Sequence, residues 1–228
     1  MYDFPPHLAM LDGAIPQAHG VSQESLILSA QAQDDSLSLV DRIESYTDII
    51  NLEIGDTSIT RARNFEHGIR QIYLKFEGSN PTGTQKDRIA FMQCHDALRR
   101  GFETLTLASC GNYGAAMALA SRLAGLRCII YIPESYHTNR ILEMEENGAE
   151  VRLYQGSYEE SVEYSIQEAL LNEWYDANPG GGNTSLQLMA YSEIAYEIYD
   201  VLRDAPKMVA VPVSNGTLLA GIFRGFVS

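Results

Sequence analysis

The chain has 228 residues, of which 45% are hydrophobic and 20% charged, as in an ordinary globular protein with a sizeable core. A formal net charge of −14 disfavours nucleic acids and anionic membranes as partners, because both are bound through basic patches. Three cysteines without a C-x-x-C pair argue against a disulfide framework, and no stretch has the pattern of a signal peptide or a membrane span. We therefore expect a cytoplasmic protein.

The N-terminal fifth of the chain has only weak hydrophobic patterning. It contains three prolines within its first 16 residues and the polar run QAQDDSLS at 31–38. Prolines and polar runs favour irregular backbone. Residues 1–50 are therefore predicted to form an extended arm, with one short helix near residues 38–50.

From residue 71 onward, strand-like and helix-like segments alternate. Such alternation predicts the α/β class, with open parallel sheets covered by helices in three layers. Strands are expected at 71–77, 104–109, 127–133, 150–154 and 207–213, and helices at 87–101, 114–125, 138–148, 157–173 and 184–202.

Three loops before predicted helices have an unusual composition: NPTGTQKDR (80–88) with Lys86, SCGNYG (109–114) and SNGTL (214–218). Glycine with hydroxyl or amide residues at a strand-to-helix turn lets backbone N–H groups converge on an anion. Each loop alone is more simply interpreted as a capped turn, and Lys86 alone as a surface lysine. Their occurrence together at the carboxyl ends of strands, where open α/β sheets bind ligands, predicts one site.

The order IYLKFEGSNPTGTQKDR, LASCGNYGAAMALA and VPVSNGTLLAGI resembles the pyridoxal-phosphate enzymes of the tryptophan-synthase-β fold (fold type II). Within that group the chain is most similar to the threonine synthases. GDTSITRARNF (55–65) is similar to the family motif that precedes the lysine strand, so the resemblance covers residues 50 to 225. It implies two domains with pyridoxal 5'-phosphate in the cleft between them. The boundaries we expect are an N-terminal arm at 1–50, a larger cofactor domain from 51–99 and 183–228, and a smaller inserted domain at 100–182.

The resemblance also implies roles for single residues. Lys86 would bind the cofactor aldehyde covalently and then act as the catalytic base, while Asp87 and Arg88 would only cap and orient its helix. No metal site is expected. The remaining cofactor-binding residues would be Asn112, Ser214, Asn215, Gly216, Thr217 and Leu218, and the substrate-binding residues Ser109, Cys110, Gly111 and Tyr113.

The implied activity is that of a lyase that carries out β- or γ-replacement or elimination on an amino acid. Its first candidate is the conversion of O-phosphohomoserine and water to threonine and phosphate. Thr84, Gln85 and Tyr113 depart from the threonine synthase pattern on the substrate side. A threonine or serine dehydratase and a cysteine-synthase-like β-replacement enzyme therefore stay open. A different class also stays open, a non-catalytic fragment or subunit that keeps the cofactor loops. A dinucleotide-binding protein is a weaker reading, because no G-x-G-x-x-G follows a strand.

Members of the resembled family continue well beyond the helix that follows the phosphate loop. The present sequence ends within that helix, at GIFRGFVS. On this ground we expect the C-terminal part of the larger domain to be missing. The chain would be the N-terminal portion of a longer protein or one half of a split one, and the expected partner is a second copy in a homodimer or that C-terminal half.

Overall fold

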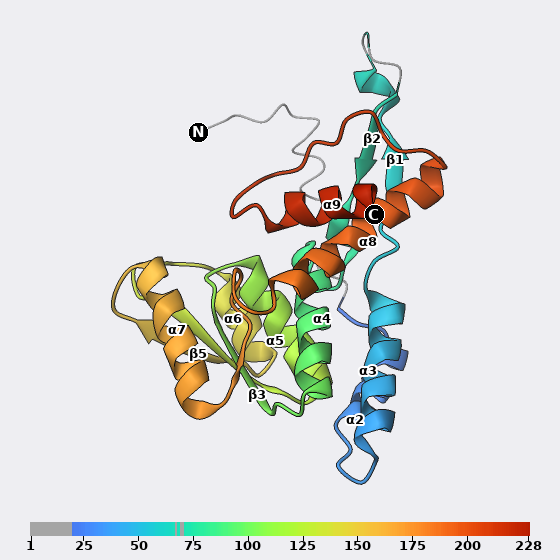
Figure 1. Ribbon diagram of the computed structural model, residues 1–228. Coiled ribbons are helices and arrows are strands. Elements are labelled where there is room, and N and C mark those ends of the chain that lie inside the picture. The colour runs from blue at the N-terminus through green and yellow to red at the C-terminus, as the bar shows by residue number, and fades with distance from the viewer. Residues whose placement is uncertain (1–19, 67, 69–70) are drawn as a thin grey trace.

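The structure, a computed structural model, describes residues 20–66, 68 and 71–228. It contains a four-stranded parallel sheet, which lies among α4 to α7 in the lower part of Figure 1. The strand order is β5-β4-β3-β6. The bounds are β3 Thr104–Ala108, β4 Arg127–Pro133, β5 Glu150–Tyr154 and β6 Tyr175–Asp176. The first three match predicted strands, and the parallel pairing confirms the α/β class.

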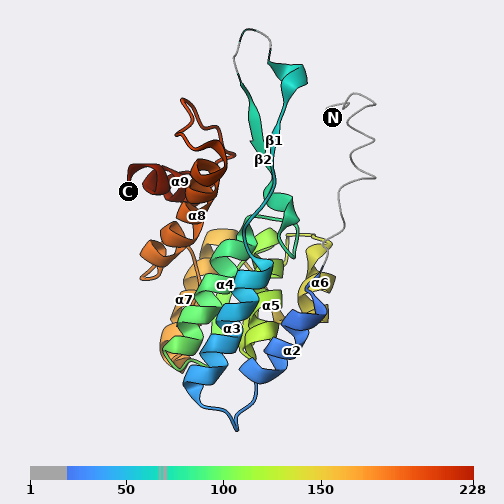
Figure 2. The same cartoon turned by 90° about the vertical axis from the view of Figure 1, so that its right-hand side faces the viewer.

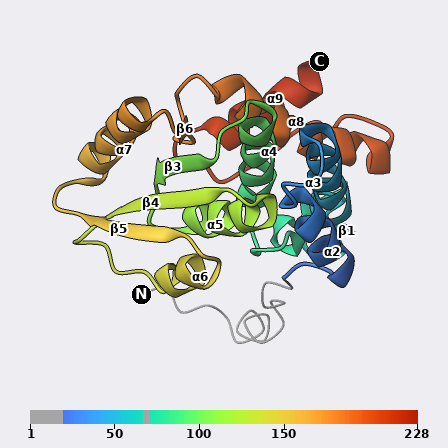
Figure 3. The same ribbon diagram turned by 90° about the horizontal axis from the view of Figure 1, so that it is seen from below.

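The sheet has helices on both faces, as alternating side chains require (Figures 1 and 3). Leu105, Leu107 and Ile130 belong to the main core, on the sheet face that α4, α5 and α6 cover. Ile129 and Tyr131 point to the opposite face, where α7 packs. These layers are formed by α4 Lys86–Arg99, α5 Asn112–Ala124 and α6 Arg140–Glu146 on one face and α7 Tyr158–Asn172 on the other.

The expected N-terminal arm is instead a helical hairpin from residue 23 onward. Helices α2 (Gln23–Ala32) and α3 (Leu39–Glu53) run beside α4 and α5 (Figure 2). The buried Tyr46 ring stacks on Phe91 at 6.2 Å, and its hydroxyl donates to a carbonyl of α5. The helix expected near residues 38–50 is present as α3, whereas the extended backbone expected before it is wrong from residue 23 onward. Helix α2 was not predicted because its buried side chains are serine and alanine, which hides the helical period. Residues 1–19 of the predicted arm lie outside the described residues.

The predicted strand at 71–77 is shorter and antiparallel. Strand β2 (Tyr73–Lys75) pairs only with β1 (Ile59–Arg61), so the motif at 55–65 and the lysine strand form one hairpin. Figure 2 shows the hairpin projecting from the body of the molecule. Short 3-10 helices, η1 Arg63–Phe65 and η2 Glu77–Ser79, lie on either side of this pairing.

Two glycines bring the last helices close together. Gly221 of α9 (Thr217–Val227) lies against the Cβ of Tyr191 on α8 (Thr184–Leu202), and Gly225 lies against the Ser192 carbonyl. A side chain at either glycine would collide with α8, so the spacing of four residues allows close contact of the two backbones.

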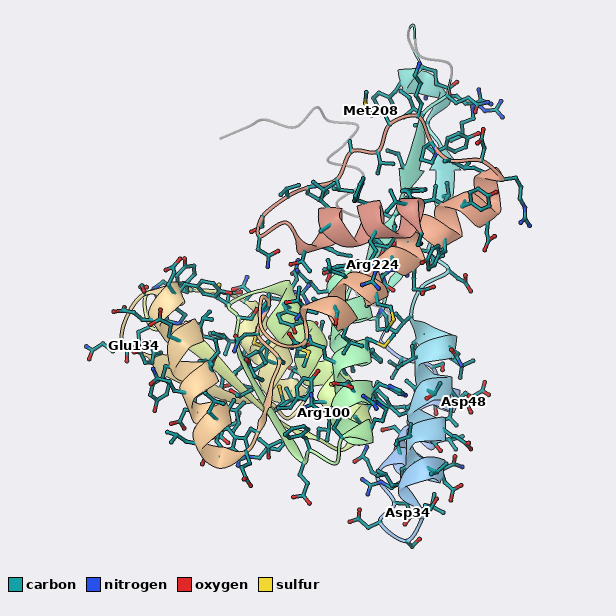
Figure 4. All side chains as sticks on the ribbon, viewed as in Figure 1. Asp34, Asp48, Arg100, Glu134, Met208 and Arg224 are labelled. Carbon is teal, nitrogen blue, oxygen red and sulfur yellow. The ribbon has the colours of Figure 1, made fainter. Side chains whose placement is uncertain are left out.

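Residues 207–213 were predicted to form a buried strand, and this prediction is wrong for the structure. The segment has no strand hydrogen bonds, and Met208 is 86% exposed at its outer edge (Figure 4). Within the described chain the segment pairs with no other strand, and a strand does not form alone. The division into two domains stays a prediction. Among the described residues, no helix is long and apolar enough to span a membrane.

Candidate active site

Lys86 is the first residue of α4 and half-buried. Its ammonium nitrogen lies between two aromatic rings, 5.7 Å from the centroid of Tyr113 and 5.8 Å from that of Tyr191. The amine has no hydrogen-bond or ion-pair partner in the described part of the chain. Burial lowers the pKa of Lys86, which enlarges the fraction of neutral amine, the form that attacks a carbonyl.

Asp87 fixes the turn that presents the lysine. Its carboxylate accepts from the backbone N–H of Thr82 at 2.9 Å and from the Thr82 hydroxyl at 2.7 Å, and its side chain is fully buried. Burial raises the pKa of Asp87 to about 6, although the Thr82 hydrogen bonds favour the charged form. These contacts hold the turn that precedes α4, in keeping with the orienting role expected for Asp87.

Arg88 sits at the centre of a buried ion-pair cluster, which we define as Arg88, Lys75, Glu77 and Glu197. Arg88 donates to Glu77 at 2.6 and 2.9 Å and to Glu197 at 2.7 and 2.9 Å. Lys75 forms a second ion pair with Glu197. Burial alone would raise the pKa of Glu197, but hydrogen bonds from Arg88 and Lys75 lower it to about 2. The cluster joins β2, η2 and α8 to the first turn of α4, two residues from Lys86.

The second predicted loop begins α5. The buried Ser109 hydroxyl accepts from the Gly114 N–H at 3.0 Å and thereby caps the helix. Tyr113 is buried, and its hydroxyl donates to the Ala177 carbonyl at 2.6 Å. The N–H groups of Asn112 and Tyr113 have no acceptor among the described residues, as first-turn geometry implies. This helix end can therefore accept an anion.

Arg140 joins the first two loops. Its guanidinium donates to the Thr82 carbonyl at 3.2 Å and to the Asn112 side-chain oxygen at 2.9 Å. The amide N–H groups of Asn112 remain free to donate within the described chain. Nothing in the sequence around Arg140 marked this role, because its partners are 28 and 58 residues away.

The third predicted loop begins α9 but is more exposed. Gly216 adopts the left-handed conformation with φ of 88°, and the Asn215 side chain accepts from the Thr217 N–H at 3.3 Å. Ser214 and Asn215 are exposed, whereas Gly216, Thr217 and Leu218 are half-buried. Gly221, one turn further along α9, packs on Tyr191, and the ring of Tyr191 lies beside Lys86. Tyr191 thus connects this helix to the lysine.

The predicted residues therefore fall into two groups. Lys86, Tyr113 and Asn112 are brought together through the Tyr113 ring and Arg140, with Ser109, Cys110 and Gly111 in the same turn. Residues 214–218 approach the lysine only through α9 and Tyr191. Both Figures 1 and 2 show α8 and α9 beyond the end of the body at which α4 and α5 begin, whereas Arg100 marks the far end of α4 in Figure 4.

These residues fit a carbonyl-bearing phosphate cofactor. The half-buried Lys86 amine has no acidic partner in the described chain and is available for a covalent bond. The N-termini of α5 and α9 offer backbone N–H donors for anionic groups. The described chain holds no cluster of side chains suited to a metal ion. An amine placed in this way suits an organic cofactor that can bond to a lysine.

Comparison with known proteins identifies the family. Residues 50–228 match the family of pyridoxal-phosphate dependent enzymes, and the chain belongs to it. Threonine synthase of Halalkalibacterium halodurans is 34% identical over 189 residues, which are 79% of this chain and 51% of that protein. The chain spans about half the length of the known relatives that it matches. The predicted resemblance and its cofactor, pyridoxal phosphate, are confirmed at the level of the family.

Solved structures confirm the fold. Cysteine synthase of Entamoeba histolytica superposes with a TM-score of 0.64 at 23% identity, covering 75% of this chain and 54% of that one. Diaminopropionate ammonia lyase of Escherichia coli in its apo form gives 0.65 at 17% identity, covering 93% and 61%. At these identities the likeness concerns the fold alone.

Proposed function

We propose that this chain carries the lysine-bearing part of an enzyme that performs elimination or replacement on a small amino acid, with threonine synthase as the first candidate. The placement of Lys86 carries the proposal: a half-buried amine, with no acidic partner in the described chain, at the start of a helix. Relatives named threonine synthase support the choice of reaction.

The chain's own residues would prepare the lysine for this chemistry. Burial lowers the pKa of Lys86 and so favours the neutral amine, the Asp87–Thr82 contacts hold its turn, and the Arg88 pairs anchor α4 to α8. Bound pyridoxal phosphate supplies an aldehyde and an electron sink. Lys86 would attack that aldehyde and later move a proton at the substrate α-carbon, since a released amine is a competent base.

The two helix N-termini would bind the anionic groups. First-turn N–H groups of α5 face the end at which α4 begins and would take the substrate carboxylate, while the Asn112 amide would donate to the cofactor ring. Residues 214–218 would hold the phosphate, using the glycine-based turn at the start of α9. A homodimer, or a partner that provides the rest of the family fold, belongs to the same proposal.

The test is covalent trapping. The purified chain is mixed with pyridoxal phosphate, reduced with borohydride and digested, and the labelled peptide is identified by mass spectrometry. We expect the label on Lys86 and its loss in Lys86→Ala, with unchanged labelling in Lys207→Ala, a change of an exposed lysine outside the site. Equal labelling of Lys86→Ala and the native chain would refute the assignment.

A second measurement separates the reactions. The chain that forms the Lys86 adduct is incubated separately with O-phosphohomoserine, threonine and O-acetylserine, and the products are identified. Threonine from O-phosphohomoserine supports the first candidate, a keto acid from threonine supports a dehydratase, and replacement on O-acetylserine supports a cysteine-synthase-like enzyme. The family of this chain is compatible with each of them, and the substitutions at Thr84, Gln85 and Tyr113 make the comparison informative.

A further inference from the structure

Tyr191 on α8 has a fully buried side chain whose hydroxyl forms no hydrogen bond within the described chain. Other buried tyrosines are paired: the Tyr46 hydroxyl donates to the Ala120 carbonyl at 3.2 Å, and that of Tyr113 to the Ala177 carbonyl at 2.6 Å. An unpaired buried hydroxyl loses its hydration without compensation, so its presence in a folded protein calls for a partner.

The position of Tyr191 suggests where this partner would be. Its ring centroid lies 5.8 Å from the Lys86 amine, and Gly221 of α9 packs on its Cβ. The base of the side chain is thereby fixed against α9 and its ring lies beside the lysine. Gln187, one turn earlier on α8, also has a buried side-chain oxygen without a partner among the described residues. Two such atoms on one helix face indicate a polar group that is added to the folded chain.

We propose that Tyr191 is a further binding residue of the Lys86 site, whose hydroxyl donates a hydrogen bond to an oxygen of the ligand that reacts with the lysine. The inference rests on the proposed function. The long, flexible Lys86 side chain covers the ring, and its movement toward the ligand would open the contact. Burial raises the pKa of Tyr191, so the hydroxyl stays protonated and can donate. The acceptor belongs either to pyridoxal phosphate or to the amino acid.

The test compares Tyr191→Phe with Tyr199→Phe, the same change two turns further along α8 at an exposed ring. In the ligand-free chain, Tyr191→Phe should leave the unfolding temperature unchanged or raise it, because it removes an unpaired buried hydroxyl. A clear fall would mean that the hydroxyl already has a structural partner, such as a bound water, and would overturn the proposal.

The ligand arms identify the acceptor. Pyridoxal phosphate is titrated against each variant, followed by O-phosphohomoserine, using absorbance and borohydride trapping on Lys86. A loss of about 5- to 100-fold in cofactor affinity in Tyr191→Phe places the acceptor on the cofactor, and a similar loss for O-phosphohomoserine alone places it on the amino acid. Unchanged affinity for both overturns the inference about Tyr191 only. Failure of the native chain to label Lys86 would overturn the proposed function and this inference together.

Discussion

The loop that carries Lys86 and the loop that precedes α9 have a similar composition, glycine with hydroxyl and amide residues, but different surroundings. The first lies under the buried ion-pair cluster and the Asp87–Thr82 contacts, so its backbone is tied to β2, η2 and α8. The second follows the exposed segment 207–213 and is held by one side-chain contact of Asn215 and by the packing of α9 on α8. The same kind of turn is therefore fixed by tertiary contacts in one place and mainly by local ones in the other.

This difference shows which signals act locally. A glycine in the left-handed region and an Asx turn need no other part of the chain, so the start of α9 forms as its sequence predicts. A strand, by contrast, needs a second strand to pair with. The apolar pattern of KMVAVPV (207–213) predicts a strand, but in the described chain this segment pairs with none. The predictions below therefore separate contacts that cross the fold from contacts within a loop.

Removing the charge of Glu197 should have the largest effect. Glu197→Gln leaves Lys75 without its carboxylate partner and Arg88 with Glu77 alone, at a site where the Arg88 side chain is only 3% exposed. We expect the free energy of unfolding to fall by about 3 kcal/mol, measured by urea denaturation near pH 7. Glu193→Gln, one turn earlier on the exposed side of α8, should stay within about 0.5 kcal/mol. Equal losses in both variants would mean that the cluster does not stabilise the fold.

The pH dependence of Glu197 has a defined sign. Its pKa in the folded chain is about 2, below the ordinary value of 4.5, so its contribution is complete above about pH 4.5 and is lost as the pH falls toward 2. The stability gap between the native chain and Glu197→Gln should therefore close over this range of pH. A gap that is constant from pH 5 to pH 2.5 would contradict the ion-pair assignment.

Asp87 should show the opposite dependence. Its pKa is about 6 when folded and 3.8 ordinarily, so the folded state binds the proton more tightly than the unfolded chain between these values. This group then destabilises the fold as the pH rises from about 4 to about 6, by up to about 3 kcal/mol. Denaturation of the native chain and Asp87→Asn across pH 4 to 7 measures it. The advantage of the native chain should shrink with rising pH, and a growing advantage would contradict the burial of the carboxylate.

The sequence predicted local features of the fold and missed contacts between distant segments. The central strands and the helices that follow the first two loops were predicted because turn residues and apolar runs act over short distances. The role of Lys86 came from the family resemblance and stays a prediction. Arg140, Glu197 and Tyr191 were missed because their partners lie 28 to 122 residues away, and a solvated helix face has the same composition. The two-residue strand β6 was missed because so short a segment has no period.

The contact between α8 and α9 should respond to a single methyl group. Gly221→Ala places a Cβ inside van der Waals contact with the Tyr191 Cβ and 3.0 Å from the Leu188 carbonyl oxygen. Because both neighbours are backbone or next to it, we expect a loss of about 1–3 kcal/mol in unfolding free energy. Gly182→Ala, where an added Cβ meets nothing within 4 Å, is the control. If the two variants are equally stable, α9 does not pack on α8 in this way in solution.

The smallest effects should come from the caps of the two loops, and they compare the loops most directly. Ser109→Ala removes the buried acceptor of the Gly114 N–H and should cost about 1 kcal/mol. Asn215→Ala removes an exposed contact to the Thr217 N–H and should change unfolding by less than about 0.5 kcal/mol, since water can replace the side chain. A larger loss for Asn215→Ala would show that the loop before α9 is held by contacts as extensive as those around Lys86.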